Sequence, residues 1–462
     1  MATAAVQNRD TTLSVCVPSD DRHGWGLALL LAAVATLFLR PADLVPTLDD
    51  WPIYQFLIVC CLVVSARAAA RQLARRKLVE QTVTACLLVL LVSVAVSHLA
   101  HGFVWAARMS MYEVGKLLVF YLLIVGLINT PQRLTFFVQW LTVAITVVAV
   151  LALLDRAGLI AVAALETVQS HGGAEGAKPD LIERIRGTGI FQDPNDFGLI
   201  LVTGLIFSAS FFLRPHAGWP RYLWLAPGMT LLATLALTHS RGALISLTCA
   251  FPAAVAYRGG WKSGALSLLC LPLLALIVSG RMLDFTALNE GTGQDRIQIW
   301  SDGLTVFRQY PFFGLGEGLF VDKYGVVTHN SFLHCYAELG ILGGTAFLAC
   351  FLGAALGLWS LRKEYRDPDA PDRMTRELRE LAHLRPFVFA ALAAYSAGML
   401  TLSRQFVAPT YLILGLAAAT TSLHGSPAHQ GRLGGRFLAI ALLAGATLLL
   451  AIHLTVRIFV RW

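Results

Sequence analysis

A series of long apolar runs, repeated along almost the whole chain, constrains the fold more than any other feature of this sequence. These runs lie at residues 25–39, 52–66, 83–99, 115–129, 135–154, 197–213, 221–239, 242–257, 264–280, 338–361, 386–403, 407–424 and 437–457. Most have the length of about 17 to 25 residues that a helix needs to cross a bilayer core. Because backbone polar groups in lipid must be satisfied within their own segment, we expect helices. The sequence therefore predicts an all-α polytopic membrane protein with about twelve transmembrane helices, or thirteen if residues 437–457 cross fully.

The distribution of charge predicts the orientation of these helices. Only 14% of the 462 residues are charged, whereas a soluble protein carries roughly a quarter. The net charge of +8 is better explained by basic cytoplasmic loops than by nucleic acid. Residues 66–80 and 362–385 are basic and should face the cytoplasm, whereas the first connection, with Asp43, Asp49 and Asp50, is acidic and should face outward.

Alternating the helices from this starting point places two long loops on the outer side. The chain then divides into N-terminal helices (1–154), a first outer loop (155–196), central helices (197–280), a large outer loop (281–337) and C-terminal helices (338–462). Loops longer than about 15 residues are usually functional or disordered. The aromatic residues of the second loop recur at partly helical spacing, which favours amphipathic helices on the membrane surface or capping the bundle.

The first outer loop ends in a polar segment directly before an apolar run. Asp193, Asn195 and Asp196 suit the N-terminal cap of that helix. A cap does not account for Arg184 and Arg186, which stand beside a Gly-Thr-Gly turn. Arginines near a helix N-terminus form a ready site for an anion, and we expect one here.

Two further arginines fall on the outer side. Arg241 follows His239 and Ser240 in a short outer turn, where it either snorkels to lipid phosphate or holds a phosphate of a ligand through its rigid fork. Arg296 and Trp300 are four residues apart and so share one helix face. That pair is either a structural stack or part of a binding site.

The most specific motif begins at His329 and Asn330, where a helix enters the membrane. Asn330, His334 and Glu338 follow at four-residue steps along one face. A histidine at this outer edge would be close to neutral and so able to accept a proton. The alternative is a purely structural role, in which a helix cap is followed by a packing face of glycines at positions 340, 343, 344, 353 and 357.

We find no pattern that predicts a metal or a cofactor. The acidic pair Asp367 and Asp369 resembles a metal-binding DxD motif, but it lies in the basic cytoplasmic loop and is interpreted as a solvated turn. The cysteines show no CxxC spacing and no zinc-type cluster, and a Walker loop is absent from the sequence.

Four of these motifs, in this order, resemble those of the O-antigen ligase superfamily, which also contains O-antigen and exopolysaccharide polymerases and protein O-oligosaccharyltransferases. The matching motifs are Arg186-x-x-Gly-x-Phe-x-x-Pro-Asn195, Ser-Arg241-Gly, Arg296-x-x-x-Trp300 and His329-Asn330-x9-Gly340-x-x-Gly343. They span residues 186–344, roughly a third of the chain. The His-Asn-x9-Gly-x-x-Gly pattern is the one associated with the ligases.

The resemblance implies a GT-C-like enzyme of the bacterial inner membrane with its active site facing the periplasm. Such an enzyme takes a glycan from undecaprenyl diphosphate and transfers it to the lipid A–core oligosaccharide, inverting the anomeric centre without a metal or cofactor. The catalytic candidates are His329, Arg186, Arg241 and Arg296, and the substrate-binding candidates are Arg184, Asn195, Trp300, Asn330 and His334. Membrane lipids are expected partners, and nucleic acid is not.

Three alternatives remain at this point, and the third of them, a purely structural membrane scaffold, would not need the outer arginines and histidine. A polymerase of the same superfamily would share the donor site and differ only in its acceptor. A transporter would usually carry ionisable residues in the middle of its spans, and the apolar runs contain almost none.

Overall fold

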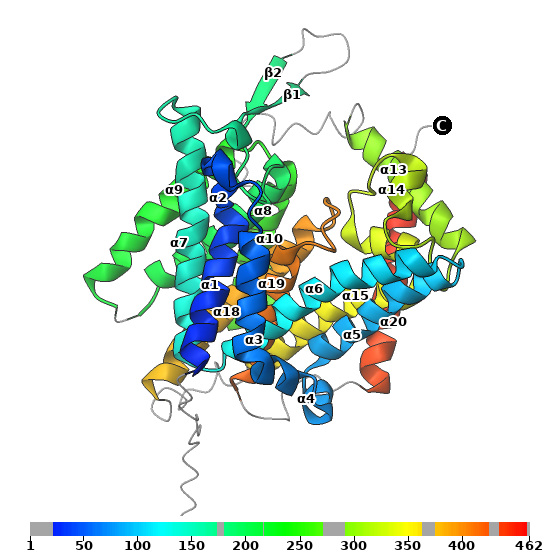
Figure 1. Cartoon of the computed structure of the whole chain (residues 1–462), viewed down its shortest axis with the longest axis horizontal. Helices are drawn as coiled ribbons and strands as arrows, with labels where there is room; N and C mark the ends of the chain where they lie inside the picture. Colours follow the sequence, from blue (N-terminus) through cyan, green and yellow to red (C-terminus); the bar gives the residue numbers. More distant parts are fainter. Residues whose placement is uncertain are drawn as a thin grey trace, which may run out of the picture.

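The computed structural model describes residues 22–172, 180–215, 217–270, 292–362, 375–424 and 434–459, and these residues form an all-α bundle (Figure 1). The elements before residue 200 are α1 (Arg22–Leu39), α2 (Pro41–Leu44), η1 (Pro46–Leu48), α3 (Ile53–Gln72), α4 (Arg75–Glu80), α5 (Thr82–Leu99), α6 (Val104–Leu127), α7 (Pro131–Arg156), η2 (Ala163–Leu165), β1 (Val168–Gly172), β2 (Asp180–Arg184) and α8 (Pro194–Phe212). The later elements are η3 (Trp219–Trp224), α9 (Leu225–Leu237), α10 (Arg241–Gly259), α11 (Trp261–Ser267), η4 (Leu268–Cys270), α13 (Thr292–Gln309), α14 (Leu319–Tyr324), α15 (Ser331–Ser360), α18 (Arg376–Gly398), α19 (Ala408–Ser422) and α20 (Gly435–Phe459).

The helices confirm the prediction of a polytopic, all-α membrane protein. Each predicted apolar run from residue 25 to 257 and from 338 to 457 coincides with a described helix. Most of the run 264–280, and the acidic pair Asp367 and Asp369, lie outside the described residues. Seven described helices are long and apolar enough to cross a membrane, and α20 is one of them. The predicted total of about twelve crossings stays a prediction.

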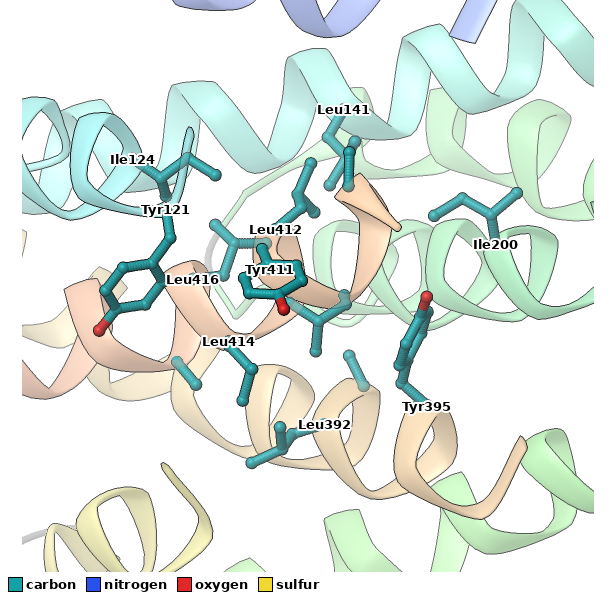
Figure 2. Packing of buried hydrophobic residues seen from close by; sticks show 14 of the residues in the cluster. Tyr121, Ile124, Leu141, Ile200, Leu392, Tyr395, Tyr411, Leu412, Leu414 and Leu416 are labelled. Carbon is teal, nitrogen blue, oxygen red and sulfur yellow. The ribbon is translucent and has the colours of Figure 1, made fainter. Parts of the chain in front are cut away.

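The core lies around α19, which is buried along almost its whole length and packs against α6, α15 and α18. Figure 2 shows its Tyr411, Leu412 and Leu416 packed among leucine, isoleucine and tyrosine side chains of neighbouring helices. Two tyrosine hydroxyls in this core find partners within it, whereas the buried hydroxyl of Tyr411 has none among the described residues. Tyr121 lies 2.9 Å from the Thr84 hydroxyl, and Tyr395 lies 3.2 Å from that of Thr410.

The first outer loop contains a β-hairpin that the sequence analysis did not predict. Strands β1 and β2 pair antiparallel, with Val168 opposite Arg184 and Gly172 opposite Asp180. The hairpin projects from one end of the bundle, at the top of Figure 1. Its last residue leads directly into the polar segment before α8, so it positions that segment.

The second outer loop contains the amphipathic helix α13, as predicted, and α13 packs against α15 and α20. Helix α15 is broken at Gly340, where φ is +64°. Segment 311–316 uses this break: the Ile341 amide donates to the Pro311 carbonyl (2.8 Å) and the Leu315 amide donates to the Ala337 carbonyl (3.0 Å). The break therefore allows segment 311–316 to form backbone hydrogen bonds directly with α15.

Candidate active site

Three helices begin close together at the same end of the bundle, and each is capped by a side chain. Asp193 caps α8, with its Oδ1 accepting from the Asn195 amide at 2.7 Å. Ser240 caps α10 through the Ala243 amide at 3.2 Å, and Asn330 caps α15 through the amides of residues 332 and 333. The caps predicted at Asp193 and Asn330 are confirmed, whereas the cap at Ser240 was not predicted from the sequence. Helix N-termini carry partial positive charge, so their convergence favours an anion.

Arg184 and Asn195 tie two of these helix starts together. The Arg184 Nε donates to the Thr238 carbonyl (2.8 Å), and its Nη2 donates to Asn195 Oδ1 (2.8 Å). The same Asn195 oxygen accepts from the Ser240 hydroxyl at 2.9 Å. The two predicted substrate-binding residues thus lie at the centre of a clamp between the hairpin, α8 and α10.

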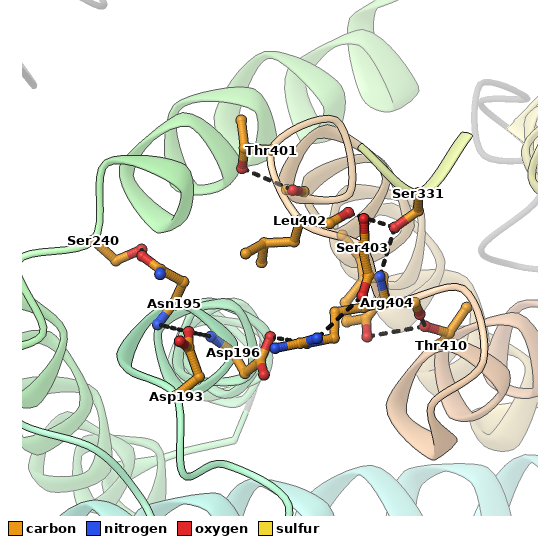
Figure 3. Close-up of polar contacts among 12 residues, drawn as sticks. Asp193, Asn195, Asp196, Ser240, Ser331, Thr401, Leu402, Ser403, Arg404 and Thr410 are labelled. Carbon is orange, nitrogen blue, oxygen red and sulfur yellow. Dashed lines mark hydrogen bonds and ion pairs between the residues drawn. The ribbon is translucent and has the colours of Figure 1, made fainter. Parts of the chain in front are cut away.

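Arg404, which the sequence analysis missed, connects the third helix start. Its Nε forms an ion pair with Asp196 Oδ1 at 2.5 Å, and its backbone amide donates to the Ser331 hydroxyl at 2.8 Å (Figure 3). The pair is partly buried, with 31% of the Arg404 side chain and 13% of the Asp196 side chain exposed. A signal was available, because Ser403, Arg404 and Gln405 interrupt two apolar runs on the predicted outer side.

A groove of about 880 Å³ opens beside the Asp196–Arg404 pair. Its polar residues include Arg186, Asp193, Asp196, Arg404 and Glu317. Its apolar residues come from the membrane helices and include Leu37, Val114, Leu117, Leu199, Ile200 and Phe406. Arg186 lies at the polar end, where its buried Nε has no hydrogen-bond partner among the described residues. The groove therefore joins a charged end, with arginines and carboxylates among its lining residues, to an apolar channel among helices.

Arg296 and Arg404 lie near His329, and Arg241 lies near Arg296; these three arginines are here called the arginine cluster. Burial lowers the pKa of His329, and the charges of Arg296 and Arg404 lower it further. Burial also lowers the pKa of Arg296, with Arg241 as the next cause. Burial alone would lower the pKa of Arg404, but the hydrogen bond and charge of Asp196 raise it above its ordinary value. The result is a neutral imidazole among permanent cations.

His329 precedes helix α15 and does not begin it as expected, because Asn330 is the capping residue. Its φ of +51° falls in the left-handed region, which non-glycine residues rarely occupy. His239 has the same place before the cap of α10, with φ of +48°. Backbone strain of this kind concentrates at functional sites.

Trp300, Asn330 and His334 support the segment that carries His329. The Trp300 indole donates to the Thr328 carbonyl at 2.9 Å, and its ring packs on the small apolar cluster between α13 and α20. His334 Nε2 lies 3.3 Å from Glu338, which confirms the pairing expected from their spacing. Its Nδ1 lies 3.2 Å from the Thr328 hydroxyl. His334 is almost fully buried, so its contacts are structural ones.

The structure thus brings Arg241, Arg296 and His329 together and places Arg186 in the adjoining groove. Within the described ranges, no three histidine, cysteine, aspartate or glutamate side chains gather as metal ligands. The fold and site define an integral membrane protein with a cationic site where three helices begin, beside an apolar groove.

Residues 226–348 match the family model described as O-antigen ligase, which confirms the resemblance to the O-antigen ligase superfamily. Members of that family are glycosyltransferase-like ligases and polymerases. The matched segment contains Arg241, Arg296, Trp300 and His329, whereas Arg186 and Arg404 lie outside it. No curated protein matches the chain.

Proposed function

We propose that this protein is an O-antigen ligase. It transfers an O-antigen polysaccharide from undecaprenyl diphosphate to the lipid A–core oligosaccharide at the periplasmic face of the inner membrane. The observation that carries the proposal is the meeting of the arginine cluster, a neutral His329 and the apolar groove where α8, α10 and α15 begin. The family match supports the same reaction class.

The donor is a diphosphate with a long isoprenoid tail, and the site offers a complement for each part. The apolar walls of the groove suit the tail, and Arg186 and Arg404 stand at its polar end. Arginine binds phosphate oxygens bidentately and keeps its charge. As the glycosidic bond to the diphosphate breaks, negative charge grows on the leaving oxygen, and the arginines stabilise it more than they stabilise the ground state.

The acceptor is a sugar hydroxyl, which needs a base. His329 is neutral because burial and two arginines disfavour its imidazolium form. It takes the proton as the acceptor oxygen attacks the anomeric carbon from the face opposite the diphosphate. The new glycosidic bond forms as the bond to the diphosphate breaks, so the anomeric configuration inverts. The reaction in this scheme uses no metal.

A complementation test decides whether the chain has this activity. The gene is expressed in a strain that makes lipid-linked O-antigen but cannot attach it, and lipopolysaccharide is examined on a gel. A ladder from the wild type, and none from an equally expressed His329→Ala variant, supports the proposal. A ladder in a polymerase-deficient strain that already has a ligase would identify a polymerase instead, and no ladder in either strain would refute both.

The orientation has its own test. Leu159 lies in the outer loop and is 72% exposed, whereas Ala74 is exposed at the basic turn before α4. Leu159→Cys should react with a membrane-impermeant thiol reagent in spheroplasts, and Ala74→Cys should react only after lysis. The reverse pattern would place the arginine cluster in the cytoplasm.

A further inference from the structure

A second cavity, here called the basic pocket, lies at the far end of the bundle from the arginine cluster. It has a volume of about 680 Å³ and is enclosed by the end of α8, by η3, by the start of α18 and by Gln139 of α7. Helix α8 connects the two places, since it begins beside Asp193 and ends at Phe212. Its 19 residues extend about 28 Å, close to the thickness of a bilayer core. The basic pocket therefore lies at the opposite membrane surface.

Positive charge dominates this pocket. Four arginines line it, and Glu380 is the only carboxylate among its described lining residues; the arginines are Arg214, Arg221, Arg376 and Arg379. Glu380 forms ion pairs with Arg214 and, at 3.5 Å, with Arg376. One negative charge against four positive charges leaves an excess that an anion would neutralise.

Two of the arginines are available to a ligand. Arg221 donates to the hydroxyl of Tyr222 at 2.9 Å, and no carboxylate in the described part of the chain pairs with it. The guanidinium of Arg379 has neither an ion pair nor a hydrogen bond among the described residues, and it is exposed. A phosphate bound between them would gain charge-assisted hydrogen bonds without breaking the Arg214–Glu380 pair.

The rim of the pocket is apolar on the side of η3 and α9. Trp219, Leu223 and Met229 are between 60% and 71% exposed. Trp224 lines the pocket itself and stacks on Phe211 with ring centroids 4.5 Å apart. Tryptophan and tyrosine gather at the headgroup level of membranes, and here they border a cluster of arginines. The combination matches a phosphate with acyl chains better than a free soluble anion.

We infer that the basic pocket binds the phosphate headgroup of an anionic phospholipid in the leaflet opposite the arginine cluster. The phosphate lies between Arg221 and Arg379, and the acyl chains follow the exposed face of α9. Basic pockets between membrane helices are a known form of headgroup recognition. Because α8 and α18 both extend from this pocket to the arginine cluster, the lipid fixes the separation of two helices that hold the active site.

The experiment measures the thermal unfolding of the purified, delipidated full chain in mild detergent. A ligand that binds only the folded state raises the melting temperature in a saturable way. Phosphatidylglycerol should do so, whereas phosphatidylcholine and inorganic phosphate at equal concentration should not. An equal rise with inorganic phosphate would show a free-anion site and overturn the lipid assignment, as would the absence of a saturable rise with phosphatidylglycerol.

A matched pair of double variants tests whether phosphatidylglycerol stabilises the protein through the basic pocket. Arg221→Gln/Arg379→Gln should raise the phosphatidylglycerol concentration for half-maximal stabilisation about tenfold or more, since it removes the charge-assisted hydrogen bonds of both guanidinium groups to the phosphate. Arg75→Gln/Arg76→Gln removes two exposed charges of α4 at the same end of the bundle (Figure 1) and should change it less than about twofold.

If both double variants raise the phosphatidylglycerol concentration for half-maximal stabilisation equally, the lipid is attracted by general surface charge, and the proposal that it binds in the basic pocket is refuted. The lipid-free melting temperature of each variant serves as the folding control. If Arg221→Gln/Arg379→Gln has a lower lipid-free melting temperature than the wild type, Arg379→Gln alone replaces it. The exposed side chain of Arg379 has no partner to lose among the described residues.

Discussion

Replacing Gly340 with alanine tests how the break in α15 docks the second outer loop. The backbone at this position has φ of +64°, and an added Cβ would lie 2.6 Å from the Phe313 nitrogen and closer still to the Phe312 carbonyl. A real Cβ does not approach backbone atoms so closely, and the atoms it meets belong to backbone that cannot swing away. Segment 311–316 must therefore move away from α15.

The cost has two parts. At φ +64° and ψ −161° the backbone of Gly340 lies in a region that is essentially restricted to glycine, and an alanine held there costs about 1–3 kcal/mol. Displacing the segment also removes the hydrogen bond from the Ile341 amide to the Pro311 carbonyl, and a hydrogen bond of this kind contributes about 0.5–1.5 kcal/mol. We expect Gly340→Ala to lose about 1.5–4.5 kcal/mol of stability in total.

Gly325 supplies the matched control. Its φ is +71°, but a Cβ there would meet nothing within 4 Å. Gly325→Ala should therefore lose only the backbone part, about 1–2 kcal/mol. The buried thiols of Cys335 and Cys350 report unfolding through a thiol-reactive fluorescent dye during heating. Equal melting temperatures for the two variants would refute the contact between Gly340 and segment 311–316.

Four further predictions concern the reaction. Arg241→Ala and Arg296→Ala should each lower the transfer rate at least about a hundredfold in a purified assay, with only partial rescue by lysine; near-normal rates would leave both as headgroup anchors. His329→Ala should abolish transfer but retain donor binding, whereas His334→Ala should keep measurable activity, and the opposite result would assign the base to His334. Because the pKa of His329 is lowered, wild-type kcat/KM should fall only as the pH drops below about 6.5. Arg296→Gln should shift this fall in kcat/KM to higher pH, because it removes a positive charge that disfavours the imidazolium form of His329. Transfer should survive EDTA, and a loss restored by magnesium or manganese would contradict the metal-free scheme.

The features that the sequence by itself determined are local ones. Long apolar runs predict helices because lipid leaves the backbone no other partner, and the helices α1, α3, α5 to α10, α15 and α18 to α20 follow those runs. The caps at Asp193 and Asn330 were predictable because a cap depends only on the residues next to it. The pairing of His334 with Glu338 followed from their spacing on one helix.

The tertiary structure decided which of these residues and helix ends come into contact. Asp196 and Arg404 are 208 residues apart in the sequence, and their ion pair exists only because α8 and the turn before α19 pack together. The clamp of Arg184 on Asn195 depends on a hairpin whose strands are short and polar, so no periodicity marked them. The break at Gly340 is set by the loop backbone that docks there. Such contacts depend on the relative placement of whole helices, which no local pattern of residues specifies.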